Sequence, residues 1–222
     1  FHEGELMIEA ARENKRVVQT GTQSRSSQAI REAIEWMHAG NLGPIKLARG
    51  FCYKPRKSIG KVTGPQAIPE GLDYDLWTGP APLTPLRRRN LHYDWHWDSA
   101  TGNGDLGNQG VHQVDLCRWA LGENGLPSDV LSVGGRLGYD DDGDTPNTQI
   151  LWCRYPTAPM LFEVRGLPRD IKAQEEDWGG RMDRYQGIGI GVVVECEGGR
   201  LHLPNYSSAE AFDLEGNSVR KW

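Results

Sequence analysis

The residues best suited to proton transfer lie in one glycine-rich stretch, residues 102–122, with the sequence GNGDLGNQGVHQVDLCRWALG. Read as a helix, this stretch brings Asn108, His112 and Asp115 onto one side, because they are spaced three or four residues apart. Trp119, one turn further on, shares that side. An imidazole can give or take a proton near neutral pH, so His112 is the candidate acid or base, and Asn108 or Asp115 would select its tautomer. A structural histidine in a buried helix fits the same spacing, which leaves both interpretations open.

Two sets of polar residues follow predicted strands, the position at which layered α/β folds bind ligands. Lys54, Arg56 and Lys57, in YKPRKSIG, come after the strand predicted at 45–53 and would bind an anionic group or the hydroxyls of a substrate. A solvated basic turn fits the same composition equally well. Gln23 and Arg25, in GTQSRS, lie between a first predicted strand and the next helix and form the second candidate pair.

The segment from Lys54 to Asp98 is rich in proline and shows little periodicity. Loops of this length inside a domain are usually functional or disordered. Trp77, Trp95 and Trp97 favour order, so we predict an ordered loop that covers a pocket. An insertion that packs on the sheet for structural reasons is the alternative.

Two histidines of this loop, His92 and His96, are four residues apart and close to Asp98. A metal ion could use them, but the segment is irregular and shows no further ligand. The sequence also lacks the P-loop, GxSxG and HExxH motifs. We therefore predict no metal site.

Periodicity places helices first and a run of strands after them. We expect a helix at Glu3–Asn14, a strand at Arg16–Thr20, and a second helix after a cap at Ser26 or Ser27. β-branched and aromatic residues alternate with turns further on. The expected strands there are 45–53, 130–137, 148–155, 160–165, 187–196, 200–203 and 209–214.

This order of elements predicts an α+β fold: a mostly antiparallel open sheet with helices on one face. The uncovered face would meet a partner subunit. Residues 166–186 are expected to form a charged loop that contains Trp178.

The predicted 102–122 helix is amphipathic. Val111, Val114, Cys117 and Leu121 are expected to face the core, together with Leu106. Glycines recur every three residues near its start, which indicates that another backbone or a ligand comes very close there. These are Gly104, Gly107 and Gly110.

Composition narrows the class of protein. The 222 residues carry 25 basic and 30 acidic side chains without a basic patch, which argues against nucleic acid or a membrane surface as a partner. The four cysteines are far apart and are expected to be free and buried. No signal peptide is evident, and the N-terminus reads as a truncated helix. The compartment stays open: a soluble protein, cytoplasmic or exported in its full-length form.

Three stretches together resemble a known family: GTQSRSS with REAIEWMHAGNLGPIKLARG, then LWTGPAP, then GNGDLGNQGVHQVDLCRWALG. They resemble the glucose–fructose oxidoreductase / inositol dehydrogenase (Gfo/Idh/MocA) family over most of the chain. The resemblance implies a Rossmann domain that binds NAD or NADP, followed by an α+β domain whose open sheet mediates homo-oligomers. Residues 1–23 would then end the dinucleotide-binding domain, and residues 24–222 would form the substrate-binding and oligomerisation domain.

The resemblance also implies residue roles. The family carries an aspartate four residues before its histidine. Here the histidine matches His112, whereas the aspartate position holds Asn108, which cannot act as a carboxylate base. Gln23 and Arg25 would lie near the cofactor and Lys54 near the substrate.

We therefore expect an NAD(P)-dependent oxidoreductase that acts on a hydroxyl of a sugar or polyol. His112 would exchange the hydroxyl proton, Asn108 would orient the substrate, and two tryptophans would stack on a sugar face. The predicted substrate contacts are Lys54, Lys57, Trp95, Trp97 and Asp115.

Two alternatives remain from the residues and the resemblance. One is a glycoside-cleaving member of the family that uses transient oxidation by a bound NAD, which a tryptophan-lined loop would suit. The other is a non-catalytic binding or oligomerisation domain, because the chain itself has no dinucleotide motif.

Overall fold

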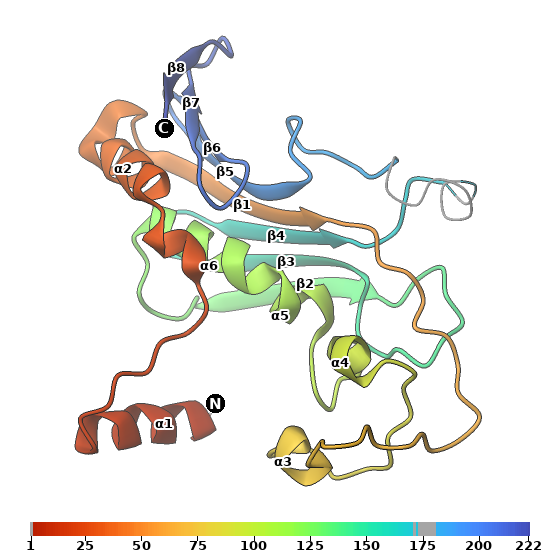
Figure 1. The fold of residues 1–222 in the computed structure, drawn as a ribbon. Helices are drawn as coiled ribbons and strands as arrows, with labels where there is room; N and C mark the ends of the chain where they lie inside the picture. The colour runs from red at the N-terminus through yellow and green to blue at the C-terminus, as the bar shows by residue number, and fades with distance from the viewer. Residues whose placement is uncertain (1, 171, 173–180) are drawn as a thin grey trace.

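The computed structural model describes residues 2–170, 172 and 181–222; Trp178 of the predicted charged loop lies outside them. An eight-stranded sheet forms the centre, with the strand order β2-β3-β4-β1-β5-β6-β7-β8 (Figure 1). β1 and β4 are parallel, and the other neighbouring pairs of this sheet are antiparallel. The strands are β1 (Ile45–Tyr53), β2 (Asp129–Gly135), β3 (Thr148–Arg154), β4 (Met160–Arg165), β5 (Ile190–Cys196), β6 (Gly199–Leu203), β7 (Glu210–Phe212) and β8 (Ser218–Lys221).

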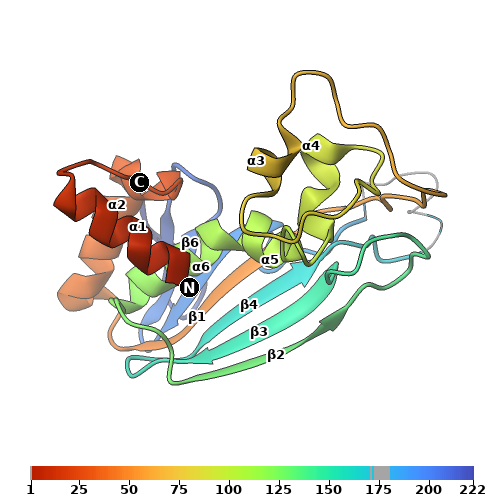
Figure 2. The ribbon, with the colours of Figure 1, turned by 90° about the horizontal axis from the view of Figure 1, so that it is seen from below.

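Helices cover one face of this sheet, as Figure 2 shows for α2, α5 and α6. Among these helices, α6 packs most extensively on the sheet and contacts β1, β4 and β5. The predicted α+β class, with a mostly antiparallel open sheet and helices on one face, is thus confirmed. The helices are α1 (His2–Glu13), η1 (Gln23–Ser26), α2 (Gln28–Trp36), η2 (Met37–Asn41), α3 (Tyr74–Thr78), α4 (Leu91–Asp94), η3 (Trp95–Trp97), α5 (Gly104–Asn108) and α6 (Gly110–Leu121).

The central strand accepts α6 at very close range because one of its positions has no side chain. A Cβ on Gly50 would lie 3.0 Å from Cβ of Gln113 and 3.2 Å from Sγ of Cys117. Ala48 and Cys52, which share this face of β1, are fully buried. Small residues on the strand therefore let the helix axis approach the sheet, and the core forms between them.

Helix ends follow local chemistry. Ser27, one of the two predicted caps, accepts a hydrogen bond from the backbone N–H of Ile30 at 3.4 Å, which satisfies a free donor of α2. Gly122 ends α6 in the left-handed conformation, with φ of 71°, which glycine adopts without strain.

The prediction of one helix over 102–122 was wrong in two respects. Two helices occupy the stretch, and α5 ends before Gln109. The buried side of α6 is also rotated from the predicted one: Val111 is 44% exposed, whereas Gln113 and Leu116 are buried. The close packing of Gly110 on the Phe162 ring sets this rotation, because a Cβ there would lie 2.7 Å from the ring.

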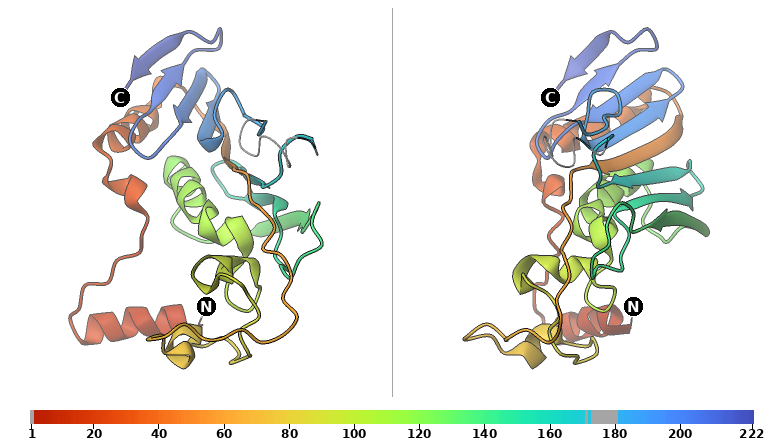
Figure 3. Two further views of the ribbon diagram at one scale, coloured as in Figure 1. Left: turned by 45° about the vertical axis from the view of Figure 1, so that its right-hand side comes forward. Right: turned by 90° about the vertical axis from the view of Figure 1, so that its right-hand side faces the viewer.

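The N-terminal part also differs from expectation. The strand predicted at Arg16–Thr20 is extended but unpaired, since no described strand lies beside it. Val17 is 98% exposed, and α1 has no buried residue. Figure 3 shows α1 standing apart from the sheet at the end of this extended segment.

Smaller differences occur elsewhere. The region Lys54–Asp98 contains three short helical turns, α3, α4 and η3, within the predicted ordered loop. The strand β8 was not predicted, and β5 begins three residues later than expected. All four cysteines are free and buried, as predicted. None of the helices in the described part of the chain is long and apolar enough to cross a membrane.

Candidate functional site

His112 lies in the first turn of α6 and is half-buried. Its ring meets that of Tyr206 edge-to-face, with 5.4 Å between the ring centroids. The Nδ1 atom is buried and has no hydrogen-bond partner among the described residues. Buried polar atoms in native proteins are nearly always bonded to protein, water or ligand. Among the described residues, the fold thus leaves one buried atom of the imidazole without a hydrogen bond.

A cavity of about 310 Å³ is lined by Tyr206, the ring partner of His112, although His112 itself is not part of its wall. Gln109 donates a hydrogen bond from Nε2 to the Tyr206 hydroxyl at 2.6 Å, which ties the start of α6 to the segment after β6. An ammonium group, three amides and a phenol thus border the space, a set that suits a ligand with several hydroxyls. The wall consists of Lys54, Gln109, Gln113, Leu116, Ile190, Gly191, Leu203, Pro204, Asn205 and Tyr206.

Asn108 ends α5 and bonds to a buried ion pair. Its Nδ2 donates to Oδ1 of Asp105 at 3.2 Å. Asp105 is fully buried and accepts two hydrogen bonds from Arg56, at 2.6 and 2.7 Å. Asn108 was expected to contact His112 and select its tautomer. It bonds to Asp105 instead.

Asp115 likewise bonds away from His112. Its carboxylate forms a bidentate ion pair with Arg25, at 2.8 and 2.9 Å, and the Arg25 guanidinium lies 5.0 Å from the Trp119 ring centroid. The predicted role of Asp115 as the orienting partner of the imidazole is therefore corrected, and Asp115 does not line the cavity. Gln23, two residues before Arg25 on η1, is exposed.

The structure separates the two predicted sugar-stacking tryptophans. Trp97 is fully buried, and the Arg136 guanidinium lies 4.6 Å from its ring centroid, so it has no free face for a sugar. This corrects its predicted role. Lys54 and Lys57 are both exposed, but only Lys54 lines the cavity of about 310 Å³.

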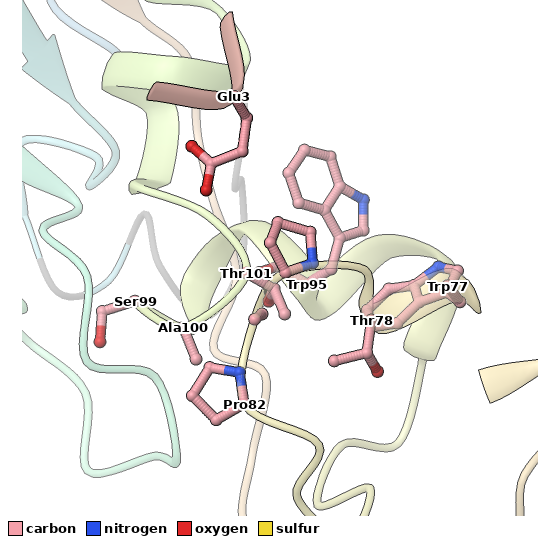
Figure 4. Close-up of a pocket in the computed structure, with 10 residues that line it drawn as sticks. Glu3, Trp77, Thr78, Pro82, Trp95, Ser99, Ala100 and Thr101 are labelled. Atoms are coloured by element: carbon pink, nitrogen blue, oxygen red, sulfur yellow. Dashed lines mark hydrogen bonds between the residues drawn. The ribbon is translucent and has the colours of Figure 1, made fainter. Parts of the chain in front are cut away.

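Trp95 lines a different cavity of about 730 Å³, together with Trp77 (Figure 4). Figure 4 shows the Glu3 side chain reaching from α1 toward the loop that carries Ser99 and Thr101. Two indole rings and two prolines line this space together with polar side chains such as Thr78 and Ser99. The predicted pocket-covering loop therefore borders a cavity of its own.

The histidine pair of this loop is divided in the same way. His92 is exposed, whereas His96 is 2% exposed and packs between aromatic rings. Asp98 pairs with Arg88 at 2.9 Å. No group of three or more metal-ligating side chains occurs in residues 2–170, 172 and 181–222.

The glycines at the start of the helices accommodate the protein itself. A Cβ on Gly104 would lie 2.7 Å from the carbonyl oxygen of Pro146, and one on Gly107 would overlap the Asn103 side chain. Of the two expectations for these positions, close approach of the chain's own atoms is the correct one, and space for a ligand is not.

Burial sets the protonation of the nearest thiol. Cys52, beside the start of the Lys54 loop, is fully buried. Burial, followed by the charge of the Asp105 carboxylate, raises the pKa of this thiol to about 12. The thiol therefore stays protonated at neutral pH and offers no nucleophile to the site.

The sequence prediction missed Gln109, Gln113 and Tyr206. Gln109 and Gln113 are close to His112 in the sequence and could have been noticed there. Tyr206 follows a strand near the end of the chain and has no motif around it. Its contact with Gln109 joins residues 97 positions apart. Only the order of the strands brings them together.

Comparison with known proteins agrees with the earlier resemblance. Residues 30–136 match the family model for the C-terminal alpha/beta domain of the Gfo/Idh/MocA oxidoreductase family. No curated protein sequence matches the chain.

Solved structures share the fold at low identity. An inositol dehydrogenase homolog from Azotobacter vinelandii complexed with NAD+ has a TM-score of 0.67 and 14% identity, over 100% of this chain and 47% of that one. An aldose-aldose oxidoreductase from Caulobacter crescentus complexed with glycerol has a TM-score of 0.61 and 16% identity, over 97% and 50%. The WlbA dehydrogenase from Bordetella pertussis, in complex with NADH and UDP-GlcNAcA, has a TM-score of 0.59 and 15% identity, over 93% and 49%. The chain thus spans about half the length of the structures it matches.

Proposed function

Because residues 30–136 match the C-terminal domain of the Gfo/Idh/MocA oxidoreductases, we propose that this chain is the substrate half of an NAD(P)-dependent oxidoreductase. Its substrate is a hydroxyl group of a sugar or polyol. The observation that carries the proposal is the unpaired, buried Nδ1 of His112, whose ring contacts Tyr206 in the wall of a cavity that also carries amide and ammonium groups.

The domain division supports the same proposal. We assign residues 1–23 to a dinucleotide-binding domain and residues 24–222 to the substrate-binding domain. Met7 of α1 is 62% exposed, and Val17 and Val18 are 98% and 67% exposed. Exposed apolar side chains in this number are typical of a surface that packs against further protein.

The chain's own residues would act as follows. His112 takes the proton of the reacting hydroxyl in oxidation and returns it in reduction. Lys54 and Tyr206 hold neighbouring hydroxyls of the substrate by hydrogen bonds. When bound, the nicotinamide supplies the site that accepts or donates hydride.

Gln23 and Arg25 are the residues we propose to hold the cofactor. Arg25 is already neutralised by its bidentate pair with Asp115, so it fits a neutral part of the dinucleotide better than a free phosphate. NAD is the first candidate, because two of the structures described above contain NAD+ or NADH. NADP stays the second.

The test is a substrate screen of the full-length gene product by nicotinamide absorbance, across sugars, inositols and glycosides. On the confirmed substrate, His112→Ala should lower kcat by roughly 10²–10⁴, the usual contribution of general acid–base catalysis. His92→Ala, at an exposed histidine on α4, is the matched control and should leave kcat unchanged. Wild-type turnover of His112→Ala would refute the proposal.

The domain assignment has a separate test. Calorimetric titration of the 222-residue chain with NAD should give no binding heat, since residues 24–222 would hold only one side of the dinucleotide. Tight binding by this chain alone would contradict the division at residue 23.

A second candidate function is glycoside cleavage through transient oxidation by a bound NAD. The tryptophan-walled cavity of about 730 Å³ favours it, because Trp77 and Trp95 offer stacking surface for a second sugar. Hydrolysis products without net NADH in the same screen would support this candidate over simple dehydrogenation.

We also infer that a second copy of the chain covers the open face of the sheet. Leu131, Val133 and Ile150 are 62%, 68% and 48% exposed on neighbouring strands. Such a patch is typical of an interface between subunits.

A further inference from the structure

Three side-chain amides line the cavity of about 310 Å³, and two of them use their donors within the protein. Gln109 donates from Nε2 to the hydroxyl of Tyr206 at 2.6 Å and to Oε1 of Gln113 at 3.4 Å. Asn205 donates from Nδ2 to Oγ of Ser208 at 2.7 Å, within its own turn. Because an amide nitrogen carries two protons, Gln109 has none left for a ligand.

The groups that stay available in this wall are hydrogen-bond donors. Gln113 is 1% exposed, its Oε1 already accepts from Gln109, and no described residue accepts a hydrogen bond from its Nε2. The Tyr206 hydroxyl also accepts from Gln109, so its own proton is left for another acceptor. Lys54 adds an ammonium group, which can only donate. A buried amide such as that of Gln113 needs a partner, which indicates a ligand or water in the cavity.

The surroundings of these donors favour a negative charge. Among the described residues that line the cavity, none is acidic. The carboxylates of the adjoining helices, Asp105 on α5 and Asp115 on α6, each accept two hydrogen bonds from an arginine and are neutralised by it. Leu116, Ile190 and Leu203 give the cavity an apolar floor, and hydrogen bonds to a charged group are stronger where the local dielectric constant is low.

We propose that this cavity is a carboxylate subsite, in which Gln113 Nε2 and the Tyr206 hydroxyl donate to the two oxygens of a carboxylate and Lys54 balances its charge. The inference rests on the proposed function and narrows its substrate to a polyhydroxy acid, such as a sugar acid. A carboxylate then takes the place of one of the hydroxyls assigned to Lys54 and Tyr206.

The chemistry of the wall distinguishes a carboxylate from a hydroxyl. A hydroxyl must find an acceptor as well as a donor, whereas a carboxylate only accepts. The amides and the phenol of this wall leave Oε1 of Gln109 as an acceptor, which suits one hydroxyl beside the carboxylate. The Tyr206 ring lies 5.4 Å from that of His112, centroid to centroid, so a carboxylate bound at Tyr206 holds the substrate one side chain away from the imidazole.

The subsite is tested by binding, without turnover. Calorimetry of the full-length protein, with no cofactor added, compares D-glucuronate with D-glucose, which differ in one carboxylate. Glucuronate should bind at least about tenfold more tightly, because hydrogen bonds to a charged group are the stronger ones. Equal affinities, or no binding of glucuronate, overturn the subsite. Since no oxidation is measured, a failure of the proposed redox activity does not alter this result.

The charge is tested by two lysines at opposite ends of β1. Lys54→Gln should reduce the preference for glucuronate over glucose to within about threefold, because it removes the positive charge from the wall. Lys46→Gln makes the same change of charge at an exposed position near the start of β1 and should keep the full preference. A preference that survives Lys54→Gln, or that falls equally in both variants, overturns the role of Lys54.

The two neutral donors are tested separately. Tyr206→Phe removes the hydroxyl and keeps the ring beside His112, and Gln113→Leu removes the buried amide at similar volume. Each should weaken glucuronate binding about tenfold, the loss expected for one hydrogen bond to a charged group. Thermal melts identify a variant that has lost its fold. Wild-type affinity for glucuronate in either folded variant overturns the proposed donor set.

Discussion

The two faces of the central sheet solve the same burial problem in different ways. On the face under α6, the strand residues are apolar and fully buried: Ala48, Phe162 and Val194 are 0 to 1% exposed. Arg49, next to Ala48, lies on the opposite face of the same strands. It pairs across the strands with Leu161, two residues before the buried Glu163. One face is thus closed by a helix, and the other by a small apolar cluster around Phe51 and Val193 together with paired charges.

Glu163 is the centre of the open face and is 3% exposed. It accepts hydrogen bonds from Arg49, from the Tyr53 hydroxyl at 2.7 Å and from Arg165 at 2.6 Å, and Arg165 continues to Asp183 at 2.5 Å. Burial opposes ionisation of Glu163, but the hydrogen bonds from Arg49, Tyr53 and Arg165 outweigh it, and its pKa lies below the usual range.

The comparison shows what the absence of a helix requires. Where no helix covers the sheet, each buried charge needs several partners. A buried charge without a partner would lower the stability of the fold. Toward β2 and β3 the network ends, and apolar side chains such as Val133 stay exposed. On the open face, the charges at the centre therefore have their partners within the chain, whereas the apolar side chains at the edge remain uncovered.

The largest effect is expected on the covered face. Phe162→Ala should lower the free energy of unfolding by about 3–5 kcal/mol, because it leaves a cavity under α6. Leu161→Ala, on the same strand but half-buried on the other face, is the control and should cost about 1 kcal/mol. Urea unfolding of both variants makes the comparison; equal losses would show that the two faces contribute alike.

Removing the centre of the open face should have the next largest effect. Glu163→Gln should cost about 1–3 kcal/mol near neutral pH, because it leaves the arginines with a neutral partner. The lowered pKa means that the ionised Glu163 stabilises the fold above its ordinary value of 4.5 and that this stability is lost as the pH falls through the folded pKa. The variant should therefore lose less stability than wild type below that pH in urea titrations. Identical acid dependence would show that Glu163 is not the group responsible.

A histidine on the open face gives a smaller effect that depends on pH. Burial, followed by the Arg200 charge, lowers the pKa of His202 to about 4 from 6.5, and its Nε2 lies 2.6 Å from Oε1 of Gln186. The folded state thus holds the neutral ring while the unfolded chain takes up a proton, so stability falls as the pH drops from 6.5 to about 4.

His202→Gln should flatten the stability curve in that window and change stability little above it. Thermal melts across the window measure this. An unchanged slope would locate the acid sensitivity elsewhere.

The smallest effect on stability, and the clearest on assembly, is expected at the edge. Leu131→Ser with Val133→Ser should change the free energy of unfolding of the isolated chain by no more than about 0.5 kcal/mol per site, because both residues are already exposed. Sedimentation should show a shift from dimer or higher oligomer toward monomer. The same sedimentation as wild type would exclude this patch from the subunit interface.

Much of the fold follows from local patterns. The strands β1, β3 and β4, the cap at Ser27 and the end of α6 at Gly122 lie where propensity and turn chemistry predict them. The rotation of α6 could not be predicted, because it depends on a contact between Gly110 and Phe162 from a strand fifty residues later. The strand expected at Arg16–Thr20 shows the same limit, since extended backbone becomes a strand only beside a partner.

The sequence by itself determined that His112 lies in a helix with polar neighbours, that the sheet is mostly antiparallel and that the cysteines are free. Those properties depend on residues within a few positions of each other. Only the tertiary structure decided the partners: Asp115 bonds to Arg25 from 90 positions away, and Tyr206, in the segment after β6, meets the His112 ring. The physical reason is that the spacing between residues fixes which side chains are neighbours within a helix. Strand order and packing decide which residues from distant parts of the sequence contact them.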